Sequence, residues 1–256
     1  MSLEPTPKRI KRGWMNLRVE RVVHDTHDSD TFYLVDADDG GCAFDYIAGQ
    51  YLTFRFDGVE AKPLVRSYTM SSSPCQPDFA AVTIKRVEGG KISNWMCDHV
   101  KAGTILRARG PIGKFVYEPG LDKDHLIMVA GGSGVTPFVS ILRQYASQLG
   151  QPGAPRRMTL LVSHRSSQDL LCAADLNPLM DRPGVAIYTT LSRENLEHAG
   201  YWHGRISDDK LSRAIDGAYH SATFMTCGPQ AIMDQTVAHL RQAGVEEAHI
   251  KTESFE

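Results

Sequence analysis

The chain has 256 residues, of which 42% are hydrophobic and 23% are charged, and its formal net charge at pH 7 is −2. This length and composition are those of an ordinary globular protein with one large domain or two of usual size. The near-neutral charge excludes a general attraction to nucleic acid or to an anionic membrane surface, and no apolar run is long enough to span a membrane.

Residues 1–15 predict an amino-terminal tail. It carries Lys8, Arg9, Lys11 and Arg12 with no apolar run behind them, so the stretch is not a secretory signal. We expect a solvated tail, and docking of these cations to an acidic partner is the alternative.

The five cysteines stand at positions 42, 75, 97, 172 and 227, far apart and without C-x-x-C spacing. An odd number of scattered thiols indicates a reducing compartment, so we expect a cytoplasmic protein. The histidines also lack the spacing of metal ligands, and we expect no metal site.

The first half of the chain predicts short strands. Runs rich in β-branched and aromatic residues, separated by turn clusters, occur at 17–23, 31–35, 51–56, 66–71, 81–86 and 104–108. One helix is expected at 93–100, with Ser93 as its N-cap. Several short strands at regular spacing indicate an antiparallel barrel or sandwich.

After the polar stretch 119–124 the pattern changes, and we place a domain boundary there. Apolar strands are expected at 126–130, 158–163, 185–191, 222–226 and 248–253. They alternate with helices expected at 136–149, 168–179, 207–215 and 230–243. This alternation predicts a parallel sheet covered by helices on both faces, with ligands at the carboxyl ends of its strands.

A glycine turn follows the first of these strands. Gly131, Gly132 and Gly134 allow the backbone to turn tightly and to approach a ligand, Thr136 is expected to cap the next helix, and Pro137 suits its first turn. Such a strand–turn–helix unit presents N–H groups to an anion. The turn is not a P-loop, the strict G-x-G-x-x-G fingerprint or a hydrolase nucleophile elbow.

Two motifs of the first half also suit a nucleotide. Arg66 and Tyr68 share one face of a predicted strand, where an arginine and an aromatic ring bind a phosphate and cover a flat ring. The stretch 85–93 runs from a basic strand end through two glycines to a helix start, a second anion-binding design. One phosphate cradle in each half predicts two nucleotides that meet at the domain interface.

The ordered motifs R-x-Y-T at 66–69, G-x-x-S at 90–93, G-G-x-G-x-T-P at 131–137 and C-G-P at 227–229 resemble those of the ferredoxin–NADP reductase family of flavoproteins. The chain is most similar to reductase components of oxygenases and to hybrid-cluster-protein reductases. In such proteins a [2Fe–2S] domain often follows a terminus that resembles residues 251–255. Because this chain stops there, we expect a reductase without that domain or a piece of a longer protein.

The resemblance implies two domains after the tail. Residues 16–118 are expected to form an antiparallel Greek-key β-barrel that binds FAD, and residues 119–256 an α/β domain with a parallel sheet that binds NADPH or NADH. FMN in place of FAD is an open alternative.

The resemblance also implies roles for individual residues. FAD would be bound by Arg66, Ser67, Tyr68, Thr69, Lys85, Val87, Gly90, Lys91, Ile92 and Ser93. The nicotinamide nucleotide would be bound by Gly132, Ser133, Gly134, Val135, Thr136, Cys227, Gly228 and Pro229, and Phe255 would cover the flavin. Tyr68 stacking on the flavin, Thr69 near its N5 and Cys227 beside the nicotinamide are the expected catalytic residues, and Glu253 is a candidate for a later proton transfer.

The choice of nucleotide depends on the ribose 2′ position, where NADPH needs cations and NADH usually an acidic residue. Ser192 and Arg193 resemble the pair that binds the 2′-phosphate in NADPH-using relatives, and Arg165 is placed to assist. Glu194 follows directly, so both nucleotides remain open, with NADPH favoured.

The expected function is hydride transfer from NAD(P)H to FAD, followed by release of single electrons to an iron–sulfur or flavodoxin-type protein, a fused cluster domain or an oxygenase. The chain is expected to act as a monomer. The alternative is a regulatory module that binds nucleotides with the same fold and without turnover.

Overall fold

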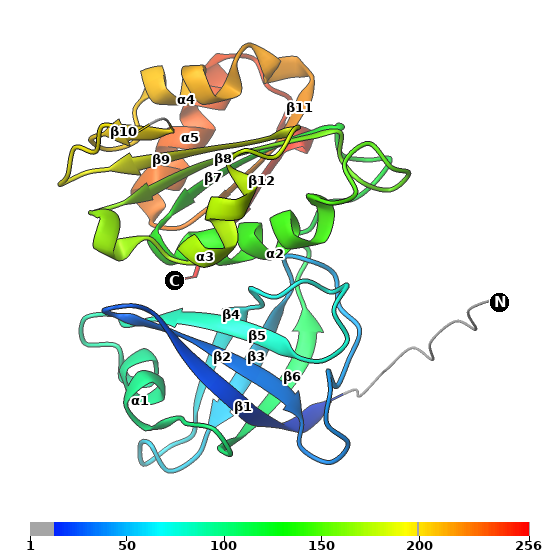
Figure 1. Ribbon diagram of the computed structural model, residues 1–256, viewed down its shortest axis with the longest axis vertical. Coiled ribbons are helices and arrows are strands. Elements are labelled where there is room, and N and C mark those ends of the chain that lie inside the picture. The colour runs from blue at the N-terminus through cyan, green and yellow to red at the C-terminus, as the bar shows by residue number, and fades with distance from the viewer. Residues whose placement is uncertain (1–12, 199, 256) are drawn as a thin grey trace.

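The computed structural model describes residues 13–198 and 200–255. The basic cluster Lys8, Arg9, Lys11 and Arg12 therefore lies outside the described residues. Two domains are stacked along the long axis of the molecule, each built around a six-stranded sheet (Figure 1).

The first domain is an antiparallel sheet with the strand order β4-β3-β6-β1-β2-β5. Its elements are β1 Trp14–Thr26, β2 Ser29–Asp36, β3 Tyr51–Phe56, β4 Leu64–Thr69, β5 Ala80–Lys85, α1 Lys91–His99 and β6 Ile105–Ile112. The two end strands approach each other at the single bridge between Met70 and Val82, so the sheet curls into a barrel that stays open between β4 and β5.

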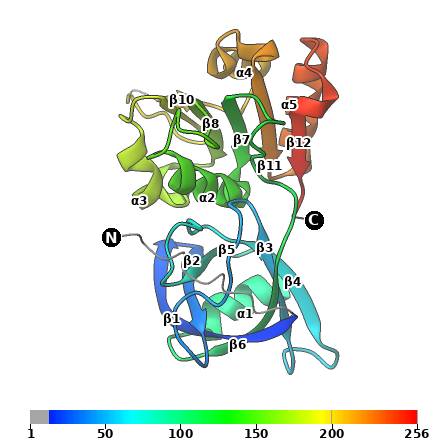
Figure 2. The same cartoon turned by 90° about the vertical axis from the view of Figure 1, so that its right-hand side faces the viewer.

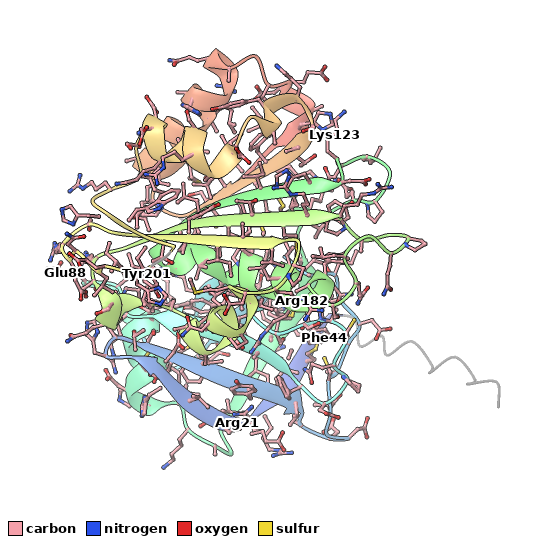
Figure 3. The ribbon with its side chains drawn as sticks, turned by 45° about the horizontal axis from the view of Figure 1, so that its top comes forward. Arg21, Phe44, Glu88, Lys123, Arg182 and Tyr201 are labelled. Carbon is pink, nitrogen blue, oxygen red and sulfur yellow. The ribbon has the colours of Figure 1, made fainter. Side chains whose placement is uncertain are left out.

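Alternation of side chains along the strands builds the barrel core. On β1, Met15, Leu17 and Val19 are buried and point inward to the core that also holds Phe32 of β2 and Phe54 of β3. Outward residues include the polar Asn16 and Glu20 and the exposed Trp14. Arg21 lies on the outer surface of the barrel (Figure 3), with its guanidinium carbon 3.4 Å from the centre of the Tyr33 ring.

The second domain is a parallel sheet with the order β10-β9-β8-β7-β11-β12. Its strands are β7 His125–Gly131, β8 Arg157–His164, β9 Val185–Leu191, β10 Tyr201–His203, β11 Ala222–Cys227 and β12 Ile250–Glu253. Its helices are α2 Thr136–Tyr145, α3 Ala173–Leu176, α4 Asp208–Ile215 and α5 Gln230–Gln242, with 3₁₀ turns η1 Gly132–Val135, η2 Ser167–Asp169, η3 Asn177–Leu179, η4 Ala218–His220 and η5 Glu247–His249.

Helices cover both faces of this sheet. The buried residues of β7 alternate, so that Leu126 and Met128 join the core under α2, whereas Ile127 and Val129 join the core with α4. In both views α2 lies between the sheet and the barrel, while α4 lies on the far side of the sheet (Figures 1 and 2). No helix in the described part of the chain is long and apolar enough to cross a membrane.

Several expectations from the sequence were wrong in detail. The helix expected at 168–179 is broken into η2, α3 and η3, because Cys172 adopts a left-handed conformation with φ of 55°. The helix from Thr136 ends at Tyr145 rather than at 149, strand 66–71 lies at Leu64–Thr69, and β10 was not expected.

Both predicted caps were also wrong. Gly90 is the N-cap of α1, and the Ser93 hydroxyl instead accepts a hydrogen bond from the Val87 N–H at 3.2 Å. Val135 precedes α2 as its cap, while the Thr136 hydroxyl donates back to the Ser133 carbonyl at 3.0 Å. In each case the hydroxyl that was expected to cap the helix forms a hydrogen bond with the tight turn before the helix instead.

Polar contacts join the domains along one side of their interface. From α2, the Ser140 hydroxyl donates to the Ser72 carbonyl at 2.6 Å. From the start of α3, the Cys172 N–H donates to the Asp25 carboxylate of β1 at 2.7 Å. These bonds connect helices of the second domain to loops and strand ends of the barrel, which fixes how the two domains face each other.

Candidate functional site

The glycine turn and the C-G-P segment lie side by side at the point where the strand order reverses. Strands β7 and β11 are neighbours, with Ala130 opposite Cys227, although β8 follows β7 in the chain. After β7 the chain continues to α2 on one face of the sheet, and after β11 it continues to α5 on the other face. This divergence leaves a crevice at the carboxyl ends of the two strands, where ligands of such sheets bind.

The two segments approach backbone to backbone. A β-carbon at Gly134 would lie 2.3 Å from the Cys227 carbonyl oxygen, and one at Gly228 would lie 2.7 Å from the Gly131 carbonyl oxygen. Gly132 has φ of +52° and open space beside it. The glycines therefore serve two purposes, because Gly134 and Gly228 allow close packing and Gly132 allows the left-handed turn.

Buried polar atoms without partners lie near the carboxyl ends of three strands of this sheet. Among the described residues these atoms are the Thr190 hydroxyl of β9, the Thr226 hydroxyl of β11 and one carboxylate oxygen of Glu253 on β12. A buried polar group without a partner is costly, so such atoms are expected where a ligand completes the site. The crevice thus fits a bound dinucleotide, with Ser133, Val135 and Thr136 supplying the turn and the start of α2, and Pro229 preceding α5.

Cys227 and Glu253 are neighbours across β11 and β12. Burial raises the pKa of the Cys227 thiol, and the Glu253 charge raises it further. Burial also raises the pKa of Glu253 to about 7. The thiol is therefore neutral at physiological pH, while the carboxyl group is able to hold or release a proton there.

The R-x-Y-T motif lies on β4, at the opening of the barrel. Tyr68 is half-buried against Phe54, with ring centres 6.1 Å apart, and burial raises the pKa of its hydroxyl. Arg66 is exposed, and within the described part of the chain its guanidinium donates only to the adjacent Val65 carbonyl, at 2.7 Å. Thr69 is buried, whereas Ser67 on the same face of the strand is exposed, with its hydroxyl 3.0 Å from that of Thr53. An arginine and an aromatic ring thus flank the open edge of the sheet.

The second cradle lies between β5 and α1. A β-carbon at Gly90 would lie 2.6 Å from the Ser93 hydroxyl, so only glycine fits this turn. Ile92 and Ser93 are buried, and Val87 is 60% exposed beside the turn. The backbone N–H groups that begin α1 thus follow a close turn, which fits a pyrophosphate.

The cations around this cradle are already paired. Lys85 lies 2.7 Å from Asp28, Arg86 lies 2.7 Å from Asp98, and Lys91 lies 2.7 Å from Glu60. Lys85 also lies 3.7 Å from Asp169 of the second domain. The basic appearance of this stretch in the sequence therefore overstates the free positive charge in the fold.

The Lys85 ammonium also occupies a cluster of potential metal ligands. Ligand atoms of His27, Asp28 and Asp169 lie within 4.8 Å of one another. Because the ammonium contacts both carboxylates, this cluster has its own cation.

The loops after β8 and β9 carry the residues expected at the ribose. Arg165 and Arg193 are exposed, and neither forms an ion pair with another described residue. The Ser192 N–H donates to the His164 carbonyl at 3.0 Å, which joins the two loops. The sequence did not reveal that Glu194 binds Ser167 across these loops, with its carboxylate 2.6 Å from the Ser167 nitrogen.

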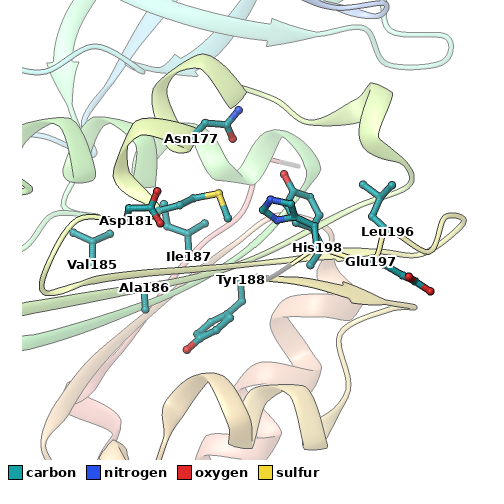
Figure 4. Close-up of a pocket in the computed structure, with 12 residues that line it drawn as sticks. Asn177, Asp181, Val185, Ala186, Ile187, Tyr188, Leu196, Glu197 and His198 are labelled. Atoms are coloured by element: carbon teal, nitrogen blue, oxygen red, sulfur yellow. The ribbon is translucent and has the colours of Figure 1, made fainter.

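A groove of about 750 Å³ lies elsewhere, along the outer edge of β9 (Figure 4). Met180, Ile187 and Tyr201 are among its lining residues. None of the residues predicted for the flavin or the nucleotide lines this groove. Phe255, expected at the flavin, is 46% exposed.

Comparisons with known proteins agree with this arrangement. Residues 17–117 match the family model of the oxidoreductase FAD-binding domain, and residues 128–238 match that of the oxidoreductase NAD-binding domain. The chain is 31% identical over 239 residues to the ferredoxin reductase component of 3-ketosteroid-9-alpha-monooxygenase from Rhodococcus rhodochrous. The chain belongs to the ferredoxin reductase family.

The ferredoxin reductase-like relatives are longer than this chain. The match to the Rhodococcus protein covers 93% of this chain and 64% of the relative. A glycine betaine monooxygenase reductase subunit from Pseudomonas aeruginosa is 29% identical, with 94% of this chain and 65% of the relative covered. The chain thus spans just under two thirds of the length of these relatives.

Solved structures share the two-domain fold of this ferredoxin reductase family member. The FAD/NAD-binding domain of a nitric oxide dioxygenase from Vibrio cholerae aligns with a TM-score of 0.81 at 23% identity, covering 94% of this chain and 98% of that one. A ferredoxin NADP⁺ reductase from Neisseria gonorrhoeae aligns with a TM-score of 0.77 at 19% identity, covering 96% of this chain and all of the other. The expected fold, an antiparallel barrel followed by a parallel α/β domain, is confirmed, as are FAD and NAD(P)H as cofactors.

Proposed function

We propose that this chain is the reductase part of an electron-transfer system that carries electrons from NADPH or NADH through FAD to a one-electron acceptor protein. The observation that carries the proposal is that β5 of the barrel packs against η1 of the second domain. The flavin cradle begins where β5 ends, and η1 is the glycine turn at the nucleotide crevice. This packing supports our proposal that the two sites face each other across the domain interface.

When bound, the flavin supplies the redox chemistry, acceptance of a hydride and release of single electrons. The residues of this chain bind and orient the reactants. Arg66 is proposed to bind a flavin phosphate, Tyr68 and Thr69 to border its ring, and the N–H groups of residues 90–93 to bind the pyrophosphate.

In the second domain, residues 132–136 and 228–229 are proposed to hold the nicotinamide nucleotide beside Cys227. The neutral Cys227 thiol would place no charge beside the nicotinamide, and Glu253, its neighbour across β11 and β12, is proposed to hold a proton near pH 7. We assign these roles within domains at 16–118 and 119–256, after a tail at 1–15.

Arg165 and Arg193, which form no ion pair with another described residue, favour NADPH over NADH, since a 2′-phosphate requires cations. The acceptor is proposed to be an iron–sulfur or flavodoxin-type protein, an oxygenase, or a [2Fe–2S] domain outside this sequence, because two relatives are named as reductase parts of monooxygenases. The five scattered cysteines, without C-x-x-C spacing, support a cytoplasmic location, and we propose a monomer.

The test is an anaerobic titration of the purified full chain. The protein should be yellow, release FAD rather than FMN on denaturation, and lose its visible absorption when NADPH or NADH is added. It should then reduce ferricyanide, a one-electron acceptor. Protein that takes up no added FAD would overturn the proposal, and flavin that is bound but never bleached would favour the regulatory module.

A further inference from the structure

The loops that follow β8 and β9 are joined residue by residue. The Ser192 N–H donates to the His164 carbonyl at 3.0 Å, and the Arg193 N–H donates to the Arg165 carbonyl at 2.8 Å. These two bonds place the arginine-bearing positions next to each other at the carboxyl edge of the sheet. Because both arginines are exposed, their guanidinium groups are available to an anion there.

Glu194 continues this series with its side chain. The Ser167 N–H donates to one carboxylate oxygen at 2.6 Å, and the Ser167 hydroxyl donates to the other at 3.1 Å. Ser167 is the first residue of η2, after the cap Ser166. The carboxylate is thus held at both oxygens by one serine, and no cation among the described residues pairs with it.

The position of Glu194 gives this contact a consequence for the nucleotide. In nucleotide-binding sheets an acidic side chain at the ribose favours the 2′-hydroxyl of NADH, whereas an arginine nearby accommodates the 2′-phosphate of NADPH. This chain carries both kinds of residue side by side, at Arg193 and Glu194.

We propose that Ser167 is a specificity-determining residue, which binds the Glu194 carboxylate away from the ribose and leaves Arg165 and Arg193 to the 2′-phosphate of NADPH. The inference rests on the proposed function and adds a positioning residue to it. Releasing Glu194 would place a negative charge near a phosphate, and like charges a few ångströms apart near a protein surface change affinity by about tenfold or more.

The decisive variant is Ser167→Pro, which removes both donors at once. Proline is well tolerated at the first position of a helical turn, and Ser166 before it is extended, with φ of −146° and ψ of 176°, as a residue before proline requires. Ser167→Ala removes only the hydroxyl and serves as a milder variant if the proline chain folds poorly. The partner variants are Glu194→Ala and the double variant Ser167→Pro with Glu194→Ala.

The measurement is the dissociation constant of 2′,5′-ADP and of 5′-AMP by calorimetry on the flavin-loaded protein, together with kcat/KM for NADPH and NADH. Ser167→Pro should weaken 2′,5′-ADP about tenfold relative to 5′-AMP and lower the NADPH-to-NADH ratio equally. Glu194→Ala should keep the wild-type preference for 2′,5′-ADP over 5′-AMP. The double variant should also show this preference, which Ser167→Pro alone loses, because it has no carboxylate at position 194 to release.

Two results would overturn the inference. One is an NADPH-to-NADH ratio of kcat/KM that is the same in Ser167→Pro as in wild type. The other is a ratio that falls as far in Glu194→Ala and in the double variant as it does in Ser167→Pro, since the contact would then only order the loops. Failure of the proposed function is separate, because wild-type protein would then show no flavin reduction by either nucleotide.

Discussion

Gly134 and Cys227 lie so close together that no side chain fits between them, since a β-carbon at Gly134 would be 2.3 Å from the Cys227 carbonyl oxygen. The contact joins two segments that are 93 positions apart in the sequence, as the difference between 227 and 134 gives. It therefore sets the width of the crevice at the carboxyl ends of β7 and β11.

Gly134→Ala should force this backbone contact apart. Overpacking of this kind costs about 1–3 kcal/mol of unfolding free energy, and the displaced turn should weaken nucleotide binding as well. Thermal unfolding and titration with 2′,5′-ADP measure both effects. Gly217→Ala is the control, because φ there is +74° with nothing within 4 Å of the added carbon. It should cost about 1 kcal/mol of strain and leave nucleotide binding unchanged, and equal binding losses in both variants would contradict this account.

Arg66→Ala should weaken FAD binding without unfolding the barrel. Among residues 13–198 and 200–255 the guanidinium bonds only to the exposed neighbour Val65, so its removal leaves no buried group there unpaired. A charge-assisted bond to phosphate contributes about 1.5–3 kcal/mol, which corresponds to a loss of roughly tenfold to a hundredfold in affinity. Fluorescence titration of flavin-free protein with FAD measures it. Arg55→Ala, on the neighbouring strand β3, is the matched control and should retain normal affinity.

Glu253→Gln should change how stability depends on pH. Burial raises the pKa of Glu253 from 4.5 to about 7, so the native protein binds this proton more tightly than the unfolded chain. Its contribution is fully present below the unfolded pKa and is lost as the pH rises through about 7. The glutamine variant should therefore match wild type near about pH 4 and exceed it near about pH 8, by at most about 3 kcal/mol. Chemical unfolding across this range tests the prediction, and parallel profiles would count against it.

Asp25→Ala should loosen the domain interface. It removes the acceptor of the Cys172 N–H and leaves this amide unpaired at a residue with φ of 55°, at a cost of about 1–3 kcal/mol. Asp25→Asn keeps an oxygen acceptor and removes the buried charge, whose burial raises the pKa of Asp25. Hydrogen exchange of the Cys172 amide should accelerate in the alanine variant and stay slow in the asparagine variant. Fast exchange in both would show that the carboxylate charge itself holds the contact.

Local signals predicted the parts of the fold that depend on local physics. The apolar run before Gly131 gave β7 almost to the residue, and Pro137 indicated the start of α2. The expected helix at 168–179 failed because the Cys172 amide is drawn to Asp25, a residue 147 positions away. The pattern of apolar residues within 168–179 contains no information about a contact with such a distant residue.

The same limit applies to the candidate site. The motifs located the crevice and the cradle, but the Glu194 contact with Ser167 spans 27 positions and two loops, which the sequence does not order in space. Likewise the basic stretch around Lys85 predicted phosphate contacts, while its carboxylate partners Asp28 and Asp169 come from distant segments. Side-chain partners across loops are set by tertiary packing.

The ion pairs around the proposed flavin cradle determine how binding there should depend on salt concentration. Lys85, Arg86 and Lys91 are each paired with a carboxylate, so a phosphate at the α1 turn would be bound chiefly through backbone N–H groups. The free guanidinium groups of Arg165 and Arg193 act at the surface, where salt screens charges over about 8 Å. Rising salt should therefore weaken the proposed contacts of Arg165 and Arg193 with a 2′-phosphate, and that of exposed Arg66 with a flavin phosphate, while the backbone contacts of the α1 turn with a pyrophosphate change little.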